Sequence, residues 1–227
     1  MRVGFALLAL AAVFGAVGCG GSDEGEPLTL EERFFDAGDA PGYKPDPEEG
    51  GKHTWATADE FANETSDRLI RASRADLEEF LRDAGFVRAI AGTRFLGEEH
   101  ERSAPHVLVG VLQFGSESGA RDAVDWYQED GLQPCPGKCA VTISEFEVDG
   151  IPDAKGIRRV VTAKRLEQTG EPGEPRDEYS ILFSDGEFSY LLSTFGPIGE
   201  ATTEASTEAI AKRIYDRVKG APPARGG

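Results

Sequence analysis

Basic side chains are scarce in this sequence. Its 227 residues include 24 lysines and arginines against 41 aspartates and glutamates, a formal net charge of −17. This balance excludes nucleic acid as a partner, because affinity for a phosphate backbone comes largely from basic side chains. We interpret the acid excess as a source of solubility and mutual repulsion between molecules. A dedicated cation-binding face is the alternative.

Cysteine is also scarce, and the three cysteines are Cys19, Cys135 and Cys139. The C-x3-C spacing of the last two differs from the spacing of thioredoxin-type redox motifs, and a zinc site needs two further ligands nearby. If Cys19 carries a lipid and the chain is exported, two cysteines remain, and such a pair most simply forms a disulfide. We therefore predict a Cys135–Cys139 bridge that braces a loop.

Long apolar runs are absent after residue 17. The uncharged run over residues 3–17, VGFALLALAAVFGAV, follows a positive start at Arg2 and ends in small residues. It is shorter than the roughly 20 residues that a helix needs to cross a bilayer, so a permanent transmembrane anchor is the weaker alternative. The pattern predicts a secretory signal peptide over residues 1–18.

Directly behind this run, Ala16-Val17-Gly18-Cys19 resembles the lipobox of bacterial lipoproteins. The resemblance implies that Cys19 receives a diacylglycerol and becomes the mature amino terminus. Ala16 stands where that family more often has leucine, and residues 16–18 also fit an ordinary signal peptidase site, so plain secretion is the alternative. Several acyl chains would give firm attachment. We predict a lipid-anchored protein on the extracytoplasmic face of the cell membrane.

Catalytic motifs are missing as well. In QFGSESGARDA neither serine has the flanking glycines of a nucleophile elbow, and the lysine of a phosphate loop is absent, so Ser116 or Ser118 is expected to cap a helix. No Ser/His/Asp arrangement can be assembled. We interpret the histidines as solvated loop residues rather than metal ligands. They are His53, His100 and His106. We expect no catalytic residue, metal or cofactor.

The acidic charge is concentrated in residues 19–60, which are rich in glycine and proline and are expected to form a tether. Several large apolar side chains are unusual for a tether, and we expect this stretch to dock on its own domain, with docking on a partner as the alternative. They are Leu28, Leu30, Phe34, Phe35, Tyr43 and Trp55.

Residues 61–220 are expected to form one domain, and residues 221–227 a disordered tail. Amphipathic patterns and stop signals predict helices near 73–85, 118–131 and 202–220, with a further helix upstream of residue 73. Ser73 is expected to cap the helix at 73–85. Strands are expected at 87–97, 106–115, 140–148 and 157–166, and a hairpin at 179–195 turns at Asp185-Gly186. Short links favour an α+β fold, with a mostly antiparallel sheet of five or six strands and helices packed on one face. We attribute Arg213 and Arg217 to the favourable charge at the end of the last helix.

Aromatic side chains offer candidate contact surfaces. Trp126 and Tyr127 are adjacent on a helix, so only one of them can face the core. Tyr190 lies in a strand of alternating aromatics. We propose Trp126, Tyr190, Phe34 and Phe35 as a ligand or partner surface. The alternative for Trp126 is that it covers a helix flank or the docked tether.

Some features over residues 105–220 resemble those of known families: a helix before a close cysteine pair, the VDGIPDAKG turn, the DGEFSYLL strand and the closing AIAKRIYDRVKG helix. They resemble actinobacterial lipoproteins and, more distantly, the extracellular sensor domain of mycobacterial serine/threonine kinases. That resemblance implies helices packed on an antiparallel sheet beside a cleft, and ligand sensing outside the cell. Those sensor domains carry more than one disulfide, whereas this chain can form one.

These observations favour a non-catalytic, lipid-anchored module that binds or senses a small ligand. An envelope interaction or assembly factor that engages another protein is the alternative, and a hydrolase is a remote one. A binding module should contain a pocket of several hundred Å3 with a few polar groups. An assembly factor should show a flat exposed apolar patch instead.

Overall fold

The computed structural model describes residues 27–47, 51–65, 72–97, 104–134, 140–165, 172–173, 175–199 and 202–222. The helices in these ranges are α1 (Leu30–Arg33), α2 (Ala58–Thr65), α3 (Arg74–Asp83), α4 (Glu117–Leu132) and α5 (Glu204–Val218). The strands are β1 (Tyr43–Pro45), β2 (His53–Trp55), β3 (Phe86–Leu96), β4 (His106–Phe114), β5 (Ala140–Phe146), β6 (Lys155–Arg165), β7 (Pro172–Gly173), β8 (Arg176–Asp185) and β9 (Phe188–Pro197).

The strands form one antiparallel sheet in the order β1-β3-β4-β9-β8-β6-β5, with β2 also paired to β3 and β7 paired to β6. The predicted α+β class and antiparallel sheet are confirmed. The predicted strand count is too low, because the sheet has nine strands within the described ranges. The additional strands β1, β2 and β7 have three residues or fewer, which is too short to produce a periodic pattern in the sequence.

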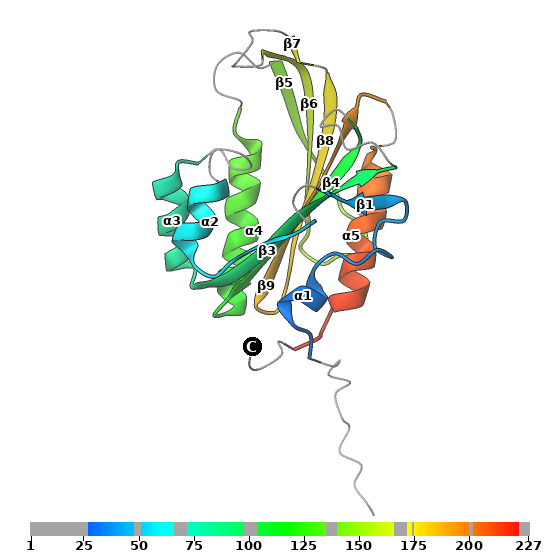
Figure 1. The fold of residues 1–227 in the computed structure, drawn as a ribbon. Helices are drawn as coiled ribbons and strands as arrows, with labels where there is room; N and C mark the ends of the chain where they lie inside the picture. The colour runs from blue at the N-terminus through cyan, green and yellow to red at the C-terminus, as the bar shows by residue number, and fades with distance from the viewer. Residues whose placement is uncertain are drawn as a thin grey trace, which may run out of the picture.

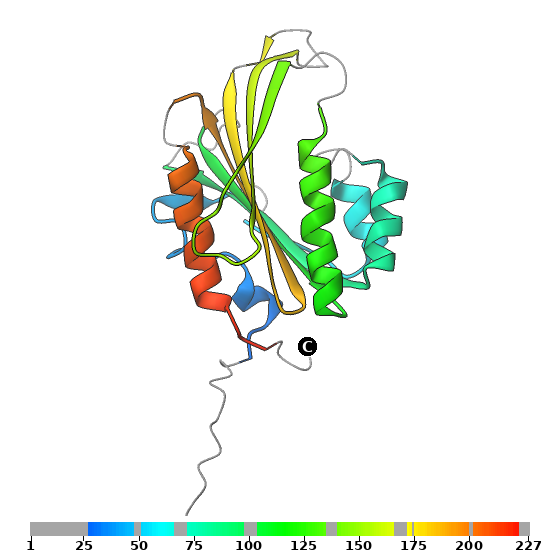
Figure 2. The same ribbon diagram turned by 180° about the vertical axis from the view of Figure 1, so that it is seen from behind.

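Helices cover both faces of the sheet, which corrects the prediction of helices on one face. Successive side chains of a strand point to opposite faces. In β4, Val109 and Val111 pack with α5, whereas Leu112 packs with α4. In β8, Ile181 belongs to the core on the α5 face and Leu182 to the core on the α4 face. Figures 1 and 2 show α4 and α5 on opposite sides of the sheet. The central strands are therefore buried on both faces, which is why they appear in the sequence as nearly continuous apolar runs.

Residues 28–45, here called the N-terminal strap, belong to the folded domain. A capping box starts α1: Glu32 N–H donates to Thr29 Oγ1 (3.2 Å), and Thr29 N–H donates to the Glu32 carboxylate (2.8 Å). The strap crosses the same face of the sheet as α5, where its large apolar side chains join the core. These buried side chains are Leu30, Phe34 and Phe35.

Residues 51–60 are also part of the fold. Trp55 of β2 is 8% exposed and contacts the ring of Phe61 edge to face, with 5.1 Å between the ring centres. The predicted tether, residues 19–60, therefore extends too far into the chain. The expectation that its apolar residues pack on their own domain agrees with the structure. The sequence pattern missed this boundary because each contributing element is three or four residues long.

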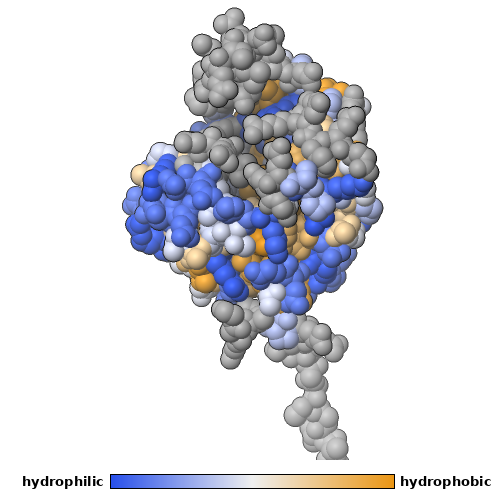
Figure 3. Space-filling view, viewed as in Figure 1, coloured by the Kyte–Doolittle hydropathy of each residue, from blue (hydrophilic) through white to orange (hydrophobic). Residues whose placement is uncertain are grey.

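The other face carries α2, α3 and α4. In the space-filling view, the lobe formed by α2 and α3 is covered by hydrophilic side chains (Figure 3), and its exposed residues include Asp59, Glu60, Asp76, Glu79 and Asp83. These carboxylates are therefore solvated on the surface of this lobe. Among the described residues, no group of three or more His, Cys, Asp or Glu side chains is arranged to hold a metal ion.

Local turn and cap signals are confirmed. Ser73 and Ser116 cap α3 and α4 by accepting backbone N–H groups of Asp76 and Gly119, and Gly186, with φ +56°, turns the β8–β9 hairpin. Pro222, a residue of the predicted disordered tail, is hydrogen-bonded in the structure, because Leu28 N–H donates to its carbonyl (3.0 Å). The two ends of the described chain thus meet below α5 (Figure 1).

Candidate functional site

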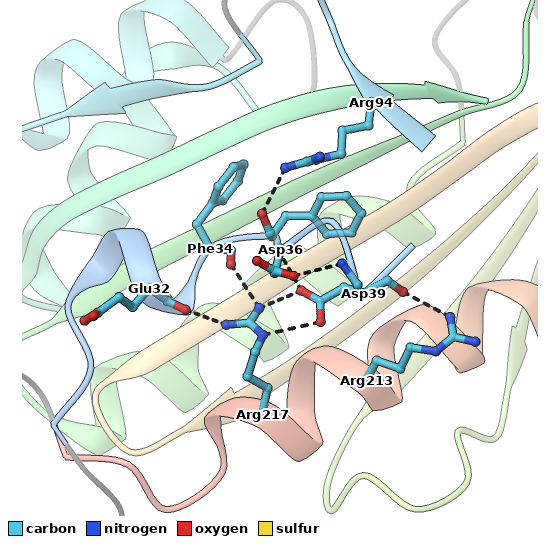
Figure 4. Close-up of polar contacts among 9 residues, drawn as sticks. Glu32, Phe34, Asp36, Asp39, Arg94, Arg213 and Arg217 are labelled. Atoms are coloured by element: carbon cyan, nitrogen blue, oxygen red, sulfur yellow. Dashed lines mark hydrogen bonds and ion pairs between the residues drawn. The ribbon is translucent and has the colours of Figure 1, made fainter. Parts of the chain in front are cut away.

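The strap is held against α5 by an ion pair (Figure 4). Arg217 of α5 donates from Nη2 to Asp39 Oδ2 (2.6 Å) and from Nε to Oδ1 (3.3 Å). It also donates to the backbone carbonyls of Phe34 (2.9 Å) and Glu32. Asp39 is 4% exposed, and its Oδ2 accepts the Asp36 N–H as well (2.8 Å). This buried carboxylate is therefore fully paired, as a buried charge must be.

Two further arginines contact the strap on either side of this ion pair (Figure 4). Arg94 of β3 donates to the carbonyl of Phe35 (3.1 Å), and its guanidinium lies 4.6 Å from the centre of the Phe35 ring. Burial lowers the pKa of Arg94, an effect opposed by the charges of Asp36 and Asp39. Arg213 of α5 donates to the backbone carbonyl of Asp39 (3.0 Å). These contacts fix the path of the chain as it approaches β1.

The start of the strap is tied to the β8–β9 hairpin by Arg33, whose side chain is fully buried. It donates to the Tyr190 hydroxyl (3.1 Å) and to Asp185 (3.3 Å), and it lies 3.9 Å from the centre of the Phe188 ring. A further N–H donates to the carbonyl of Ala221. Burial raises the pKa of Tyr190 to about 12, although Arg33 opposes this shift. The role of this cluster is to anchor both ends of the domain.

A groove with a cavity volume of about 350 Å3 lies between the strap, the end of β3 and α5. Its lining is Ala40, Pro41, Tyr43, Leu96, Ser206, Ala209, Ile210 and Arg213. Tyr43 and Leu96 are cross-strand partners in β1 and β3, and the ion pair of Asp39 fixes the adjoining wall of the groove. Half-buried Tyr43 has a raised pKa because of its burial. The groove thus combines an apolar lining with hydroxyl groups and one guanidinium.

The predicted aromatic surface is not assembled. Phe34, Phe35 and Tyr190 are 7%, 5% and 2% exposed and belong to the core on the α5 face. Their rings pack inside the domain and present little surface to solvent. Trp126 lies on the other side of the sheet and stacks on Phe80 of α3, with 4.8 Å between ring centres. This position agrees with the alternative interpretation, in which Trp126 covers a helix flank.

The three cysteines Cys19, Cys135 and Cys139 lie outside the described residues. The lipid and the disulfide therefore stay predictions. His100 is also outside. His53 lies 3.1 Å from the Glu64 carboxylate, and His106 stacks on a phenylalanine ring in the sheet.

Sequence reasoning did not predict the ion pair between Asp39 and Arg217 or the residues that line the groove. It attributed Arg213 and Arg217 to the helix end, although their i, i+4 spacing places them on one side of α5. That side flanks the buried stripe of Ile210 and Ile214. Two arginines beside a buried apolar stripe could have indicated that an acidic segment of the chain contacts this side of the helix. Their partner Asp39 could not be identified, because it lies 178 positions away in the chain.

No protein-family model matches the chain, and the comparison with curated proteins finds no match. Among solved structures, the chain is similar to the extracellular domain of PknH from Mycobacterium tuberculosis, with a TM-score of 0.53 and 12% sequence identity. The match covers 85% of this chain and 97% of that one. At this identity the likeness shows the fold alone. It confirms the predicted resemblance to a mycobacterial kinase sensor domain, and it extends beyond residues 105–220.

Proposed function

We propose that this protein is a non-catalytic, lipid-anchored module on the extracytoplasmic face of the membrane, and that it binds or senses a small ligand in the groove beside α5. The groove is the observation that carries the proposal. Its volume of about 350 Å3 falls in the range of small-molecule sites, and an apolar lining with a few polar groups is typical of such sites. The similarity to an extracellular domain supports the location.

The anchor we propose is the lipid on Cys19. No helix in the described ranges is long and apolar enough to span a membrane. Pro27, the first described residue, follows Cys19 by eight positions, a span of at most about 28 Å. A lipid on Cys19 would therefore hold the end of the domain near α1 close to the bilayer, whereas a tether of some forty residues would not.

The described residues that line the groove include no catalytic base with a suitable pKa, which supports a binding role. The ionisable lining residues in the described structure are Tyr43 and Arg213. Burial raises the pKa of Tyr43, and an arginine stays protonated at any physiological pH. General-base catalysis needs a group whose pKa is near the working pH.

An assembly factor is less favoured by the surface. The exposed large hydrophobic side chains of the described structure are Val87 and Ile198, each 45% exposed. Val87 is at the start of β3, and Ile198 follows the end of β9. The strand register through β4 places these positions at opposite ends of the sheet. They therefore do not form a continuous apolar patch.

Native mass spectrometry of the protein purified from its own host tests the binding role. We expect a small molecule to copurify, and we expect Ala209→Trp, which fills the groove, to lose it. Ala75→Trp is the matched control, because Ala75 is an exposed helical alanine of α3 outside the groove. A copurified mass that survives Ala209→Trp would place the ligand elsewhere.

The anchor and the bridge have separate tests. Mass spectrometry of the mature amino terminus should show acylated Cys19, and an unmodified terminus would remove the anchor. Alkylation without reductant should leave Cys135 and Cys139 unlabelled. Labelling of both thiols would contradict the predicted disulfide.

A further inference from the structure

Arg213 is the one charged residue among the described residues that line the groove. Its side chain is exposed at the surface of α5, and one N–H donates to the backbone carbonyl of Asp39 (3.0 Å). Within the described ranges no carboxylate lies close enough to form an ion pair with it. Arg217, one turn later, differs in this respect because it is paired with Asp39. Arg213 therefore keeps most of its donors and its full charge at the rim of the groove.

Arg213 differs from the described arginines that pair with a carboxylate. Acidic residues outnumber basic ones by 41 to 24, and most described arginines pair with a carboxylate. The acidic residue nearest to Arg213 along α5, Asp216, pairs with Lys212 and Lys219. Glu208 has a backbone hydrogen bond with Asp149, and neither Asp216 nor Glu208 lines the groove. The groove is thus a locally cationic site on an acidic protein.

Apart from the hydroxyl groups of Tyr43 and Ser206, apolar side chains form the rest of the floor and walls. They are chiefly Leu96, Ala209 and Ile210. A ligand that matches both features has an apolar body and one anionic end. The planar guanidinium suits a carboxylate or a phosphate, because its N–H groups match two oxygens at once. A cationic ligand would meet like charge.

We propose that the groove binds a small amphipathic anion, whose apolar body lies against Leu96 and Ile210 and whose carboxylate or phosphate pairs with Arg213. This rests on the proposed binding function and names its ligand class. The anion gains from the ion pair, and the apolar body gains from leaving water.

Three probes of equal chain length test the ligand class: octanoate, 1-octanol and octylamine. Each is titrated into the mature protein, with amide NMR shifts along α5 and β1 as the readout. We expect affinity to fall in the order octanoate, octanol, octylamine. Arg213→Gln should weaken octanoate binding about fivefold, the effect of a partly exposed ion pair, and leave octanol binding unchanged. Arg213→Lys should restore part of the difference.

Lys212→Gln is the matched control, because Lys212 is an exposed cation on the same helix that pairs with Asp216 (2.9 Å) and does not line the groove. It should leave all three affinities unchanged. Equal binding of octanoate and octylamine, or no effect of Arg213→Gln on octanoate, would overturn the proposal. So would the absence of any shift in the groove amides with octanoate.

The outcomes separate this proposal from the binding function. If octanoate and octanol bind equally and Ala209→Trp blocks both, the groove is a ligand site and the anionic class is wrong. If no probe binds but a copurified mass is lost in Ala209→Trp, the binding function again stands and the proposed anionic class is wrong. If the copurified mass survives that substitution and no probe binds, both proposals fail.

Discussion

Phe34→Ala distinguishes a packed strap from a tether. In a tether the substitution would change the free energy of unfolding by less than about 0.5 kcal/mol. In the structure Phe34 is 7% exposed and belongs to the core on the α5 face. Truncating a buried phenylalanine costs about 3–5 kcal/mol, from lost burial and the cavity left behind. That is a large part of the roughly 5–15 kcal/mol that stabilises a typical domain.

Urea unfolding followed by circular dichroism measures this effect. With a slope of about 2 kcal/mol/M, the expected loss lowers the urea midpoint by about 1.5–2.5 M. Val87→Ala is the control, since Val87 is 45% exposed and its truncation should shift the midpoint only slightly. If both variants unfold at the midpoint of the unaltered protein, Phe34 is not part of the core, and the inclusion of the strap in the domain is refuted.

Three further predictions concern polar and aromatic contacts. Asp39→Asn and Arg217→Gln should each cost about 1–3 kcal/mol and be non-additive when combined, because they break the same ion pair; additive losses in a double-mutant cycle would contradict this pairing. Phe80→Ala should cost about 1 kcal/mol and shift the indole N–H NMR signal of Trp126, and an unmoved signal would exclude their stacking. Tyr190 should contribute about 2 kcal/mol to the loss of stability between pH 10 and pH 12, because burial raises its pKa to about 12 and the unfolded chain loses that proton first. Burial also raises the pKa of Tyr127 and of Tyr43, so the measurement is the difference between two proteins: Tyr190→Phe should lose less stability over this range, and an equal loss would contradict this cause.

Elements with strong local signals could be predicted from the sequence. α3 and α4 start at the serines that the sequence marks as caps, Ser73 and Ser116, because an N-cap satisfies backbone donors within its own first turn. The Asp185-Gly186 turn forms the expected hairpin for the same reason, since its geometry depends on a few adjacent residues. The α+β class followed from the order of such elements.

The assignment of helices to faces could not be predicted in this way. The apolar run of β8 does not indicate whether helices pack on one face of the sheet or on both. Only the positions of α4 and α5 decide which side chains meet them. The same ambiguity made Tyr190 look like a surface residue, although it is buried.

By itself, the sequence determined the acidic character of this protein, its main helices and its principal hairpin, since composition and local spacing are enough for these. It is also the basis of the predicted export and lipid anchor at Cys19. The tertiary structure alone decided that the strap is part of the core and that a groove lies beside α5. These features depend on contacts between distant residues, such as Asp39 with Arg217, 178 positions apart, and no local pattern specifies which distant groups will meet.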